Sequence, residues 1–344
     1  MPPKKSDTNP QNGPRLARLP PELFDAIIET YETLPSTFCY TTETIDSKYF
    51  ERSDALTALS QTCRTLREIT LHRLWARLDI CRVPARAEGS WYKYIMLALE
   101  RKANGIADSP LRYHVRTLTL LLSKNNPDAA LAALWTMLPK LPNLRTIHVT
   151  HCKTLGLAKS LADAKLELPN VTALFLPSEG SVFLRLCPNA THVRCLAGSG
   201  ASLLSSLTPK IEVFDGVLDW RDATSIDRLV KYAPNLHTLE LRRPVNYFSF
   251  RAITLLDGAA LQGAQSIRKL APLKKLAKLI LTFPVADEKP GDTDSVAAAR
   301  VLLRTGSGAV ERTLVVQRVV APHSSYQGGK KQDILLSSTT EVFY

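Results

Sequence analysis

The chain has 344 residues, of which 45% are hydrophobic, and a formal net charge of +12. This length and composition suit about two globular domains, and no apolar run approaches the roughly 18 residues that a membrane-spanning helix requires. The first eighteen residues also lack the apolar stretch of a secretion signal. Six cysteines occur singly, without CxxC pairs, which indicates reduced thiols in the cytosol or nucleus.

The charge is unevenly distributed along the chain. Residues 1–82 contain 11 Lys and Arg against 11 Asp and Glu, whereas residues 112–344 contain 29 against 18. The densest basic stretch runs from Arg242 to Lys278, with eight basic residues and one acid, Asp257. Such a stretch fits an acidic or phosphorylated protein partner through charge-assisted hydrogen bonds. A solvated helical face is the alternative interpretation.

The N-terminal region predicts a helical domain over residues 15–82, preceded by a disordered tail, 1–14, that is rich in Pro, Asn and Lys. Its first helix follows two prolines and carries an apolar stripe at Phe24, Ile27, Ile28 and Tyr31. Residues 35–53 lose this period and predict an inserted loop.

Further helices are expected after that loop. Ser53 or Asp54 is a plausible N-cap, and the apolar stripe then continues through Leu56, Leu59, Cys63, Leu66 and Ile69. Residues 83–111 predict a helical linker, with a helix from Trp91 to Lys102.

From residue 112 onward the main signal is repetition. Apolar residues recur at positions 1, 4 and 6 of a short pattern, in copies that begin 19 to 40 residues apart. There are seven copies: Val115/Leu118/Leu120, Leu144/Ile147/Val149, Val171/Leu174/Leu176, Ala190/Val193/Cys195, Ile211/Phe214/Gly216, Leu236/Leu239/Leu241 and Leu276/Leu279/Leu281. Tags such as LPNL, LPNV, CPNA, TPKI and APNL introduce five of them.

Helix-like stripes lie between these copies, for example Leu131, Leu134, Trp135 and Leu138. Strand and helix therefore alternate, which predicts an α/β leucine-rich-repeat solenoid with a parallel sheet on its inner side. It is expected to span residues 112–344, with an irregular C-terminal end that includes one more strand near residues 310–320.

The helical domain resembles the F-box. The resemblance rests on the LPPEL segment at the start (Leu19 to Leu23), the pair Leu56 and Leu59, Cys63 with Arg64, and Leu74 with Trp75 at the end. It covers about a fifth of the chain and is closest to the variant common in fungal F-box proteins with C-terminal leucine-rich repeats, in which a short strand follows the last helix. Two departures are the eighteen residues between the first two helices and Leu66 in place of an aromatic residue.

The resemblance implies a non-enzymatic adaptor of an SCF-type cullin ubiquitin ligase. Its F-box would bind the linker subunit and its repeats a protein substrate. The implied linker-binding residues are Leu19, Pro20, Leu23, Ile27, Leu56, Leu59, Cys63 and Trp75, and the alternative for each of them is an internal core position. The expected substrate-binding residues, from the basic stretch, are Arg242, Arg243, Arg251, Lys274, Lys275 and Lys278. Neither the substrate nor the oligomeric state follows from the sequence.

Sequence motifs for catalysis are missing. The chain contains no GxxxxGK[ST], GxGxxG, HExxH or GxSxG motif, so no enzyme activity and no cofactor are expected. The cluster of His148, His151, Cys152, Cys187, His192 and Cys195 is interpreted as repeat positions and not as a metal site. Two other functions stay open: a repeat scaffold without ligase association, and a basic protein that binds RNA or chromatin.

Overall fold

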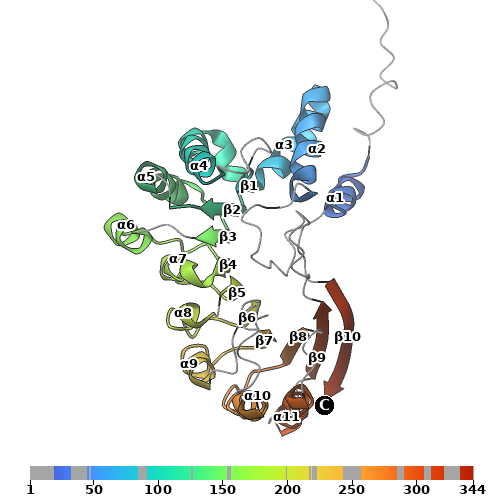
Figure 1. The fold of residues 1–344 in the computed structure, drawn as a ribbon. Helices are drawn as coiled ribbons and strands as arrows, with labels where there is room; N and C mark the ends of the chain where they lie inside the picture. The colour runs from blue at the N-terminus through green and yellow to red at the C-terminus, as the bar shows by residue number, and fades with distance from the viewer. Residues whose placement is uncertain are drawn as a thin grey trace, which may run out of the picture.

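The computed structural model of the chain describes residues 19–31, 45, 48–83, 91–124, 127–152, 156–198, 200–216, 218, 223–242, 257–284, 290–305, 311–320 and 334–343. Across these residues helices and strands alternate in an α/β fold (Figure 1). The predicted disordered tail, 1–14, and most of the predicted loop 35–53 lie outside the described residues.

The strands of the described chain form one open, ten-stranded sheet in which the spatial order equals the order along the sequence. Strands β1 to β9 pair in parallel, and β10 runs antiparallel to β9 at the edge. Their bounds are β1 Arg77–Ile80, β2 Thr117–Leu122, β3 Thr146–Cys152, β4 Ala173–Pro177, β5 His192–Ala197, β6 Val213–Gly216, β7 Thr238–Arg242, β8 Lys278–Pro284, β9 Arg312–Val320 and β10 Ile334–Phe343. The seven predicted strands are β2 to β8, and the expected further strand is β9.

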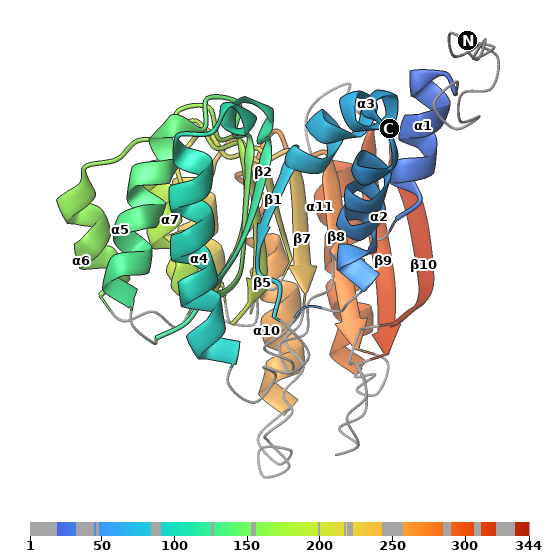
Figure 2. The ribbon, with the colours of Figure 1, turned by 90° about the horizontal axis from the view of Figure 1, so that it is seen from above.

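The helices form two groups. Helices α1 (Pro21–Glu29), α2 (Lys48–Thr62) and α3 (Arg64–Trp75) lie at the end of the sheet near β1, and the other α-helices line the outer side of the arc of strands (Figures 1 and 2). The latter are α4 Trp91–Ala107, α5 Pro127–Met137, α6 Leu157–Ala164, α7 Val182–Leu186, α8 Ala201–Leu204, α9 Ala223–Tyr232, α10 Asp257–Arg268 and α11 Pro290–Thr305. Short 3₁₀ turns occupy η4 Pro110–His114, η5 Leu138–Lys140 and η6 Ser178–Gly180.

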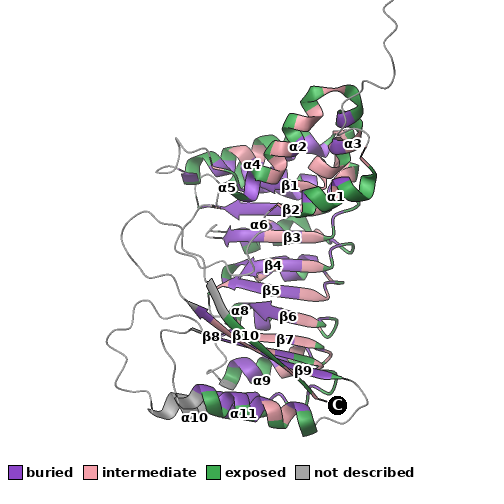
Figure 3. Ribbon diagram, turned by 90° about the vertical axis from the view of Figure 1, so that its right-hand side faces the viewer, coloured by how far each residue is buried: buried purple, intermediate pink, exposed green. Residues whose placement is uncertain are grey.

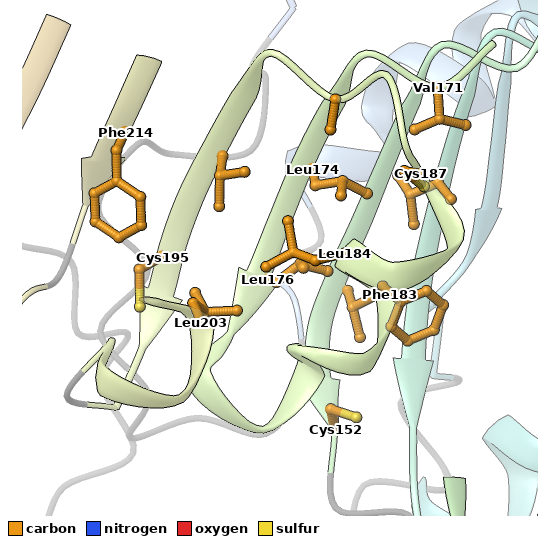
Figure 4. Packing of buried hydrophobic residues seen from close by; sticks show 14 of the residues in the cluster. Cys152, Val171, Leu174, Leu176, Phe183, Leu184, Cys187, Cys195, Leu203 and Phe214 are labelled. Carbon is orange, nitrogen blue, oxygen red and sulfur yellow. The ribbon is translucent and has the colours of Figure 1, made fainter. Parts of the chain in front are cut away.

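The core lies between the sheet and the outer helices. Because side chains alternate along a strand, residues in register on neighbouring strands point to the same side. Leu118, Ile147, Leu174, Val193 and Phe214 are paired in this way and are all buried. Helices α7 and α8 add buried side chains such as those of Phe183, Leu184 and Leu203 to the same layer (Figure 4).

The turns before the strands repeat as closely as the strands do. The carbonyl of Arg116 accepts hydrogen bonds from the N–H groups of Arg145 and Thr146, and the carbonyl of Arg145 accepts from Thr172 and Ala173. The asparagines of the tags join this ladder: Nδ2 of Asn143, Asn170, Asn189 and Asn235 donates to a backbone carbonyl of the preceding unit, that of Tyr113, Pro142, Pro169 and Pro209 respectively. In the TPKI tag Lys210 takes this place and donates to Oδ1 of Asn189 at 2.6 Å.

The structure differs from the sequence-based expectations at two N-terminal boundaries. Helix α2 begins at Lys48, so residues 48–53 are helical and neither Ser53 nor Asp54 is an N-cap. Tyr49 explains the early start, because it is buried and its hydroxyl donates to Asp79 at 2.8 Å. The sheet also begins earlier than residue 112, at Arg77, and α4 from the predicted linker packs into the same core.

Candidate interaction surfaces

Helix α1 carries apolar side chains on two faces. Phe24 and Ile28 are buried with Leu56 in a small core, against which Leu59, Ile69 and Leu74 also pack. On the other face, Leu23 and Ile27 remain 54% and 48% exposed. A helix that buries one apolar stripe and exposes a second one has a face available to a partner. Figure 3 shows that α1 contains both buried and exposed residues.

An ion pair fixes α1 against α3. Arg73 donates to both carboxylate oxygens of Asp25, at 2.5 and 3.0 Å, and to the carbonyl of Ile69 at 2.6 Å. Its guanidinium group also lies 5.2 Å from the ring centre of Phe24. The hydrogen bond from Arg73 lowers the pKa of Asp25. This bidentate pair adds to the packing of Phe24 and Ile28 against Leu56, and together they leave Leu23 and Ile27 directed outward.

Six of the eight predicted linker-binding residues separate into two sets. Pro20, Leu23 and Ile27 are exposed and Leu19 is half-buried, and these four lie on or just before α1. Leu56 is 1% exposed, and Leu59 packs beside it. These two residues pack beneath α1, and Leu56 is too buried to contact a partner.

Cys63 and Trp75 have local structural roles instead. Cys63 is the N-cap of α3, where its sulfur accepts the N–H of Leu66 at 3.5 Å. Trp75 packs against the main core two residues before β1, the place that Val115 holds before β2. The sequence assigned Cys63 to an apolar stripe because it could not show that α2 ends at Thr62.

The inner face of the sheet carries a polar row that begins under α2. In register from β1 to β6 its members are Asp79, Thr119, His148, Phe175, Arg194 and Asp215. The hydroxyl of Tyr49 contacts both Asp79 and Thr119, at 2.8 and 3.0 Å, and Arg77 stacks 4.3 Å above the Tyr49 ring. Helix α2 thus covers the first two strands on this face.

Aromatic and charged side chains meet at the centre of the inner row. The rings of His148 and His192 lie 4.2 and 5.1 Å from Phe175, and the Arg194 guanidinium group lies 5.3 Å from the same ring. Arg194 donates to both oxygens of Asp215, at 2.8 and 2.6 Å, and Nε2 of His192 lies 3.3 Å from Oδ2. The side chains of the inner row therefore bind mainly one another.

Burial and pairing set the charges of this row. Burial, together with the nearby charges of Arg77 and Arg194, lowers the pKa of His148 to about 3, so this ring is neutral near pH 7. Burial acts to raise the pKa of Asp215, but the hydrogen bonds from Arg194 and His192 outweigh it and the pKa is lowered. On the neighbouring strand β7, burial and the charge of Asp215 raise the pKa of Glu240.

The sequence located most of the inner row but not its beginning. Because side chains alternate along a strand, the residue between the last two repeat positions of each copy is expected on the inner face, which predicts Thr119, His148, Phe175, Arg194 and Asp215 from the sequence alone. This expectation missed Asp79, although Trp75, Leu78 and Ile80 repeat the same apolar spacing and were a usable signal.

The predicted substrate-binding residues are only partly brought together. Lys274, Lys275 and Lys278 are exposed in and after the turn that enters β8. Arg242, in contrast, is 6% exposed at the end of β7, where it pairs in register with Thr282 of β8, so it does not belong to an exposed basic surface. Arg243 and Arg251 lie outside the described residues.

No protein-family model and no curated protein sequence matches the chain. Among the described residues no group of three or more His, Cys, Asp or Glu side chains is placed to hold a metal ion. Over the same residues, every helix is too short or too polar to cross a membrane.

Proposed function

We propose that the chain is a substrate-recognition adaptor of an SCF-type cullin ubiquitin ligase, located in the cytosol or nucleus. In this proposal α1 to α3 form an F-box that binds the linker subunit, and the repeated strand–helix units are leucine-rich repeats that hold a protein substrate. Such an adaptor needs no catalytic residues, because it acts by raising the effective concentration of substrate at the ligase.

The exposed apolar face of α1 carries this proposal. Leu23 and Ile27 are among the largest exposed apolar side chains of the described chain, and they belong to the LPPEL segment and the helix that follows it. The Asp25–Arg73 pair holds this face in a fixed orientation, so little conformational entropy would be lost on binding.

The experiment is a binding measurement between the full chain and the purified linker subunit. Changing Leu23 and Ile27 to Asp should abolish binding, because charges placed in an apolar interface cost about 2 to 5 kcal/mol. Both residues are exposed, so the variant should keep the wild-type melting temperature. Val301→Asp, at a 58% exposed position on α11, is the matched control and should bind like the wild type.

A repeat scaffold without ligase association is the second candidate. It is favoured by the contacts of α2 with the inner face, since Tyr49, Asp79 and Thr119 join the N-terminal helices to the sheet as a capping unit would. A folded wild-type chain with no measurable affinity for the linker subunit would select this scaffold function over the adaptor.

A further inference from the structure

A cavity of about 120 Å³ opens at the amino-terminal ends of β8 and β9. It lies between the turn of residues 271–276, which enters β8, and the last turn of α11. Its apolar wall is formed by Leu273, Leu276, Leu302 and Leu303, and its charged wall by Lys274 and Arg312.

The cavity arises where the repeat pattern fails. Two residues before each of the strands β2 to β8 stands a buried apolar side chain: Val115, Leu144, Val171, Ala190, Ile211, Leu236 and Leu276. Because Lys278 pairs with Thr313, the corresponding residue before β9 is Glu311. Glu311 is exposed, so the last parallel strand supplies no apolar side chain to this place.

The two cations differ in exposure. Arg312 is 7% exposed, and its Nη1 donates to the carbonyl of Leu303 at 3.3 Å, which fixes the guanidinium group against the apolar wall. Lys274 is exposed at the mouth of the cavity. A ligand in this cavity would therefore contact leucine side chains and positively charged side chains at the same time.

The volume limits the ligand to a small group. A cavity of roughly 150 Å³ lined by apolar side chains holds one benzene molecule, so about 120 Å³ suits one branched aliphatic side chain. Asp, Glu and phosphoserine carry their charge at the tip of the side chain and leave the leucine wall unfilled. A residue that joins an aliphatic side chain directly to a carboxylate occurs only at the C-terminus of a peptide.

We propose that this cavity binds the C-terminal residue of an extended peptide, with an aliphatic side chain against the leucines and the carboxylate between Lys274 and Arg312. Arginine and lysine stabilise a carboxylate through charge-assisted hydrogen bonds. The inference rests on the proposed substrate role of this surface. Its test does not involve the linker subunit, so the two proposals can fail separately.

The test uses the full chain and fluorescein-labelled Gly-Ser-Gly-Ser-Gly-Leu with a free C-terminal carboxylate, measured by fluorescence anisotropy. The free acid should bind at least about ten-fold more tightly than the C-terminal amide, since the neutral amide can accept hydrogen bonds but cannot form an ion pair with the two cations. A peptide ending in Gly should also bind more weakly. A third peptide, Gly-Ser-Glu-Ser-Gly-Leu with an amidated terminus, has the same net charge as the free acid and controls for general attraction.

Variants locate the binding. Lys274→Gln should weaken binding of the free acid about five- to ten-fold, whereas Lys275→Gln, at the exposed neighbour that does not line the cavity, should leave it unchanged. Ala271→Trp, at the exposed rim, should block the cavity without altering the core. Equal affinity for the free acid and the amidated Glu peptide, or equal effects of the two lysine variants, would overturn the proposal.

Discussion

At the scale of residues, single side chains link neighbouring repeat units. The asparagines of the tags each donate to a carbonyl of the preceding unit, at 2.6 to 3.0 Å. Asn189 links its unit to both neighbours, because its Oδ1 also accepts a hydrogen bond from Lys210 of the following unit. A backbone carbonyl in a turn needs a donor, and an asparagine after the proline of the tag supplies it.

Replacing Asn189 by Ala should lower the free energy of unfolding by about 1 kcal/mol, the usual net contribution of a hydrogen bond. The measurement is the urea midpoint at unchanged slope. Asn104→Ala, at an exposed site within α4, is the control and should be neutral or slightly stabilising, since Ala favours a helix. Equal midpoints for Asn189→Ala and the wild type would show that the ladder adds no stability.

His148 should make the protein sensitive to acid. Its pKa is about 3 in the folded chain and near 6.5 when unfolded, so between these values the unfolded state binds more protons and stability falls as the pH falls. Each unit of difference corresponds to about 1.4 kcal/mol at most. A His148→Gln variant should show a smaller loss of stability between pH 6.5 and pH 4 in denaturant titrations. An unchanged pH slope contradicts this assignment.

At the scale of elements, each strand contributes a pair of side chains that only the adjacent units cover. In β7 these are Leu239 and Leu241, both fully buried, while Thr238 beside them is half-buried on the opposite side. Their neighbours in register are Leu279 and Leu281 of β8. The stability of one unit therefore depends on its neighbours.

Leu239→Ala and Leu241→Ala should each cost about 2 to 5 kcal/mol, through the lost transfer free energy and the cavity left behind. Thr238→Ala, one position away, should cost under about 1 kcal/mol. Thermal and urea unfolding followed by circular dichroism measure the difference. A cost below about 1 kcal/mol for Leu239→Ala would mean that this place is not part of the packed core.

At the scale of the whole molecule, the exposed lysines before and in β8 lie near the opposite end of the ten-stranded sheet from β1, although the arc of strands curves back toward the side of α1 (Figure 1). In the adaptor proposal α1 binds the linker subunit and the distal surface binds an acidic or phosphorylated substrate. Attraction between exposed charges is screened over about 8 Å at physiological ionic strength, so such binding must weaken with salt.

Changing Lys274, Lys275 and Lys278 to Glu should therefore reduce both the affinity for the substrate and the dependence of that affinity on salt. Substrate binding is measured across a salt series for the wild type and the variant. A control variant changes three exposed cations on the outer helices, Lys93, Arg101 and Lys159, to Glu. Equal affinities and salt slopes in the two variants would assign the three lysines to an ordinary solvated face.

The sequence by itself determined strands β2 to β9, their order and the burial of their leucines, but not β1 or β10. Period-two alternation and the repeat spacing depend on local geometry and on contacts between adjacent units, and both are visible in a linear pattern. Most of the inner row, including His148, Phe175 and Arg194, followed from the same alternation.

Contacts between residues distant in the sequence decided the rest. The contact of Tyr49 with Asp79 stabilises the start of α2 at Lys48. The packing of Phe24 and Ile28 against Leu56 leaves Leu23 and Ile27 as the exposed face of α1. Packing between β7 and β8 buries Arg242, and the exposed Glu311 opens the cavity beside Arg312. Residue type and spacing do not encode these outcomes, because each depends on which side chain the folded chain places opposite another.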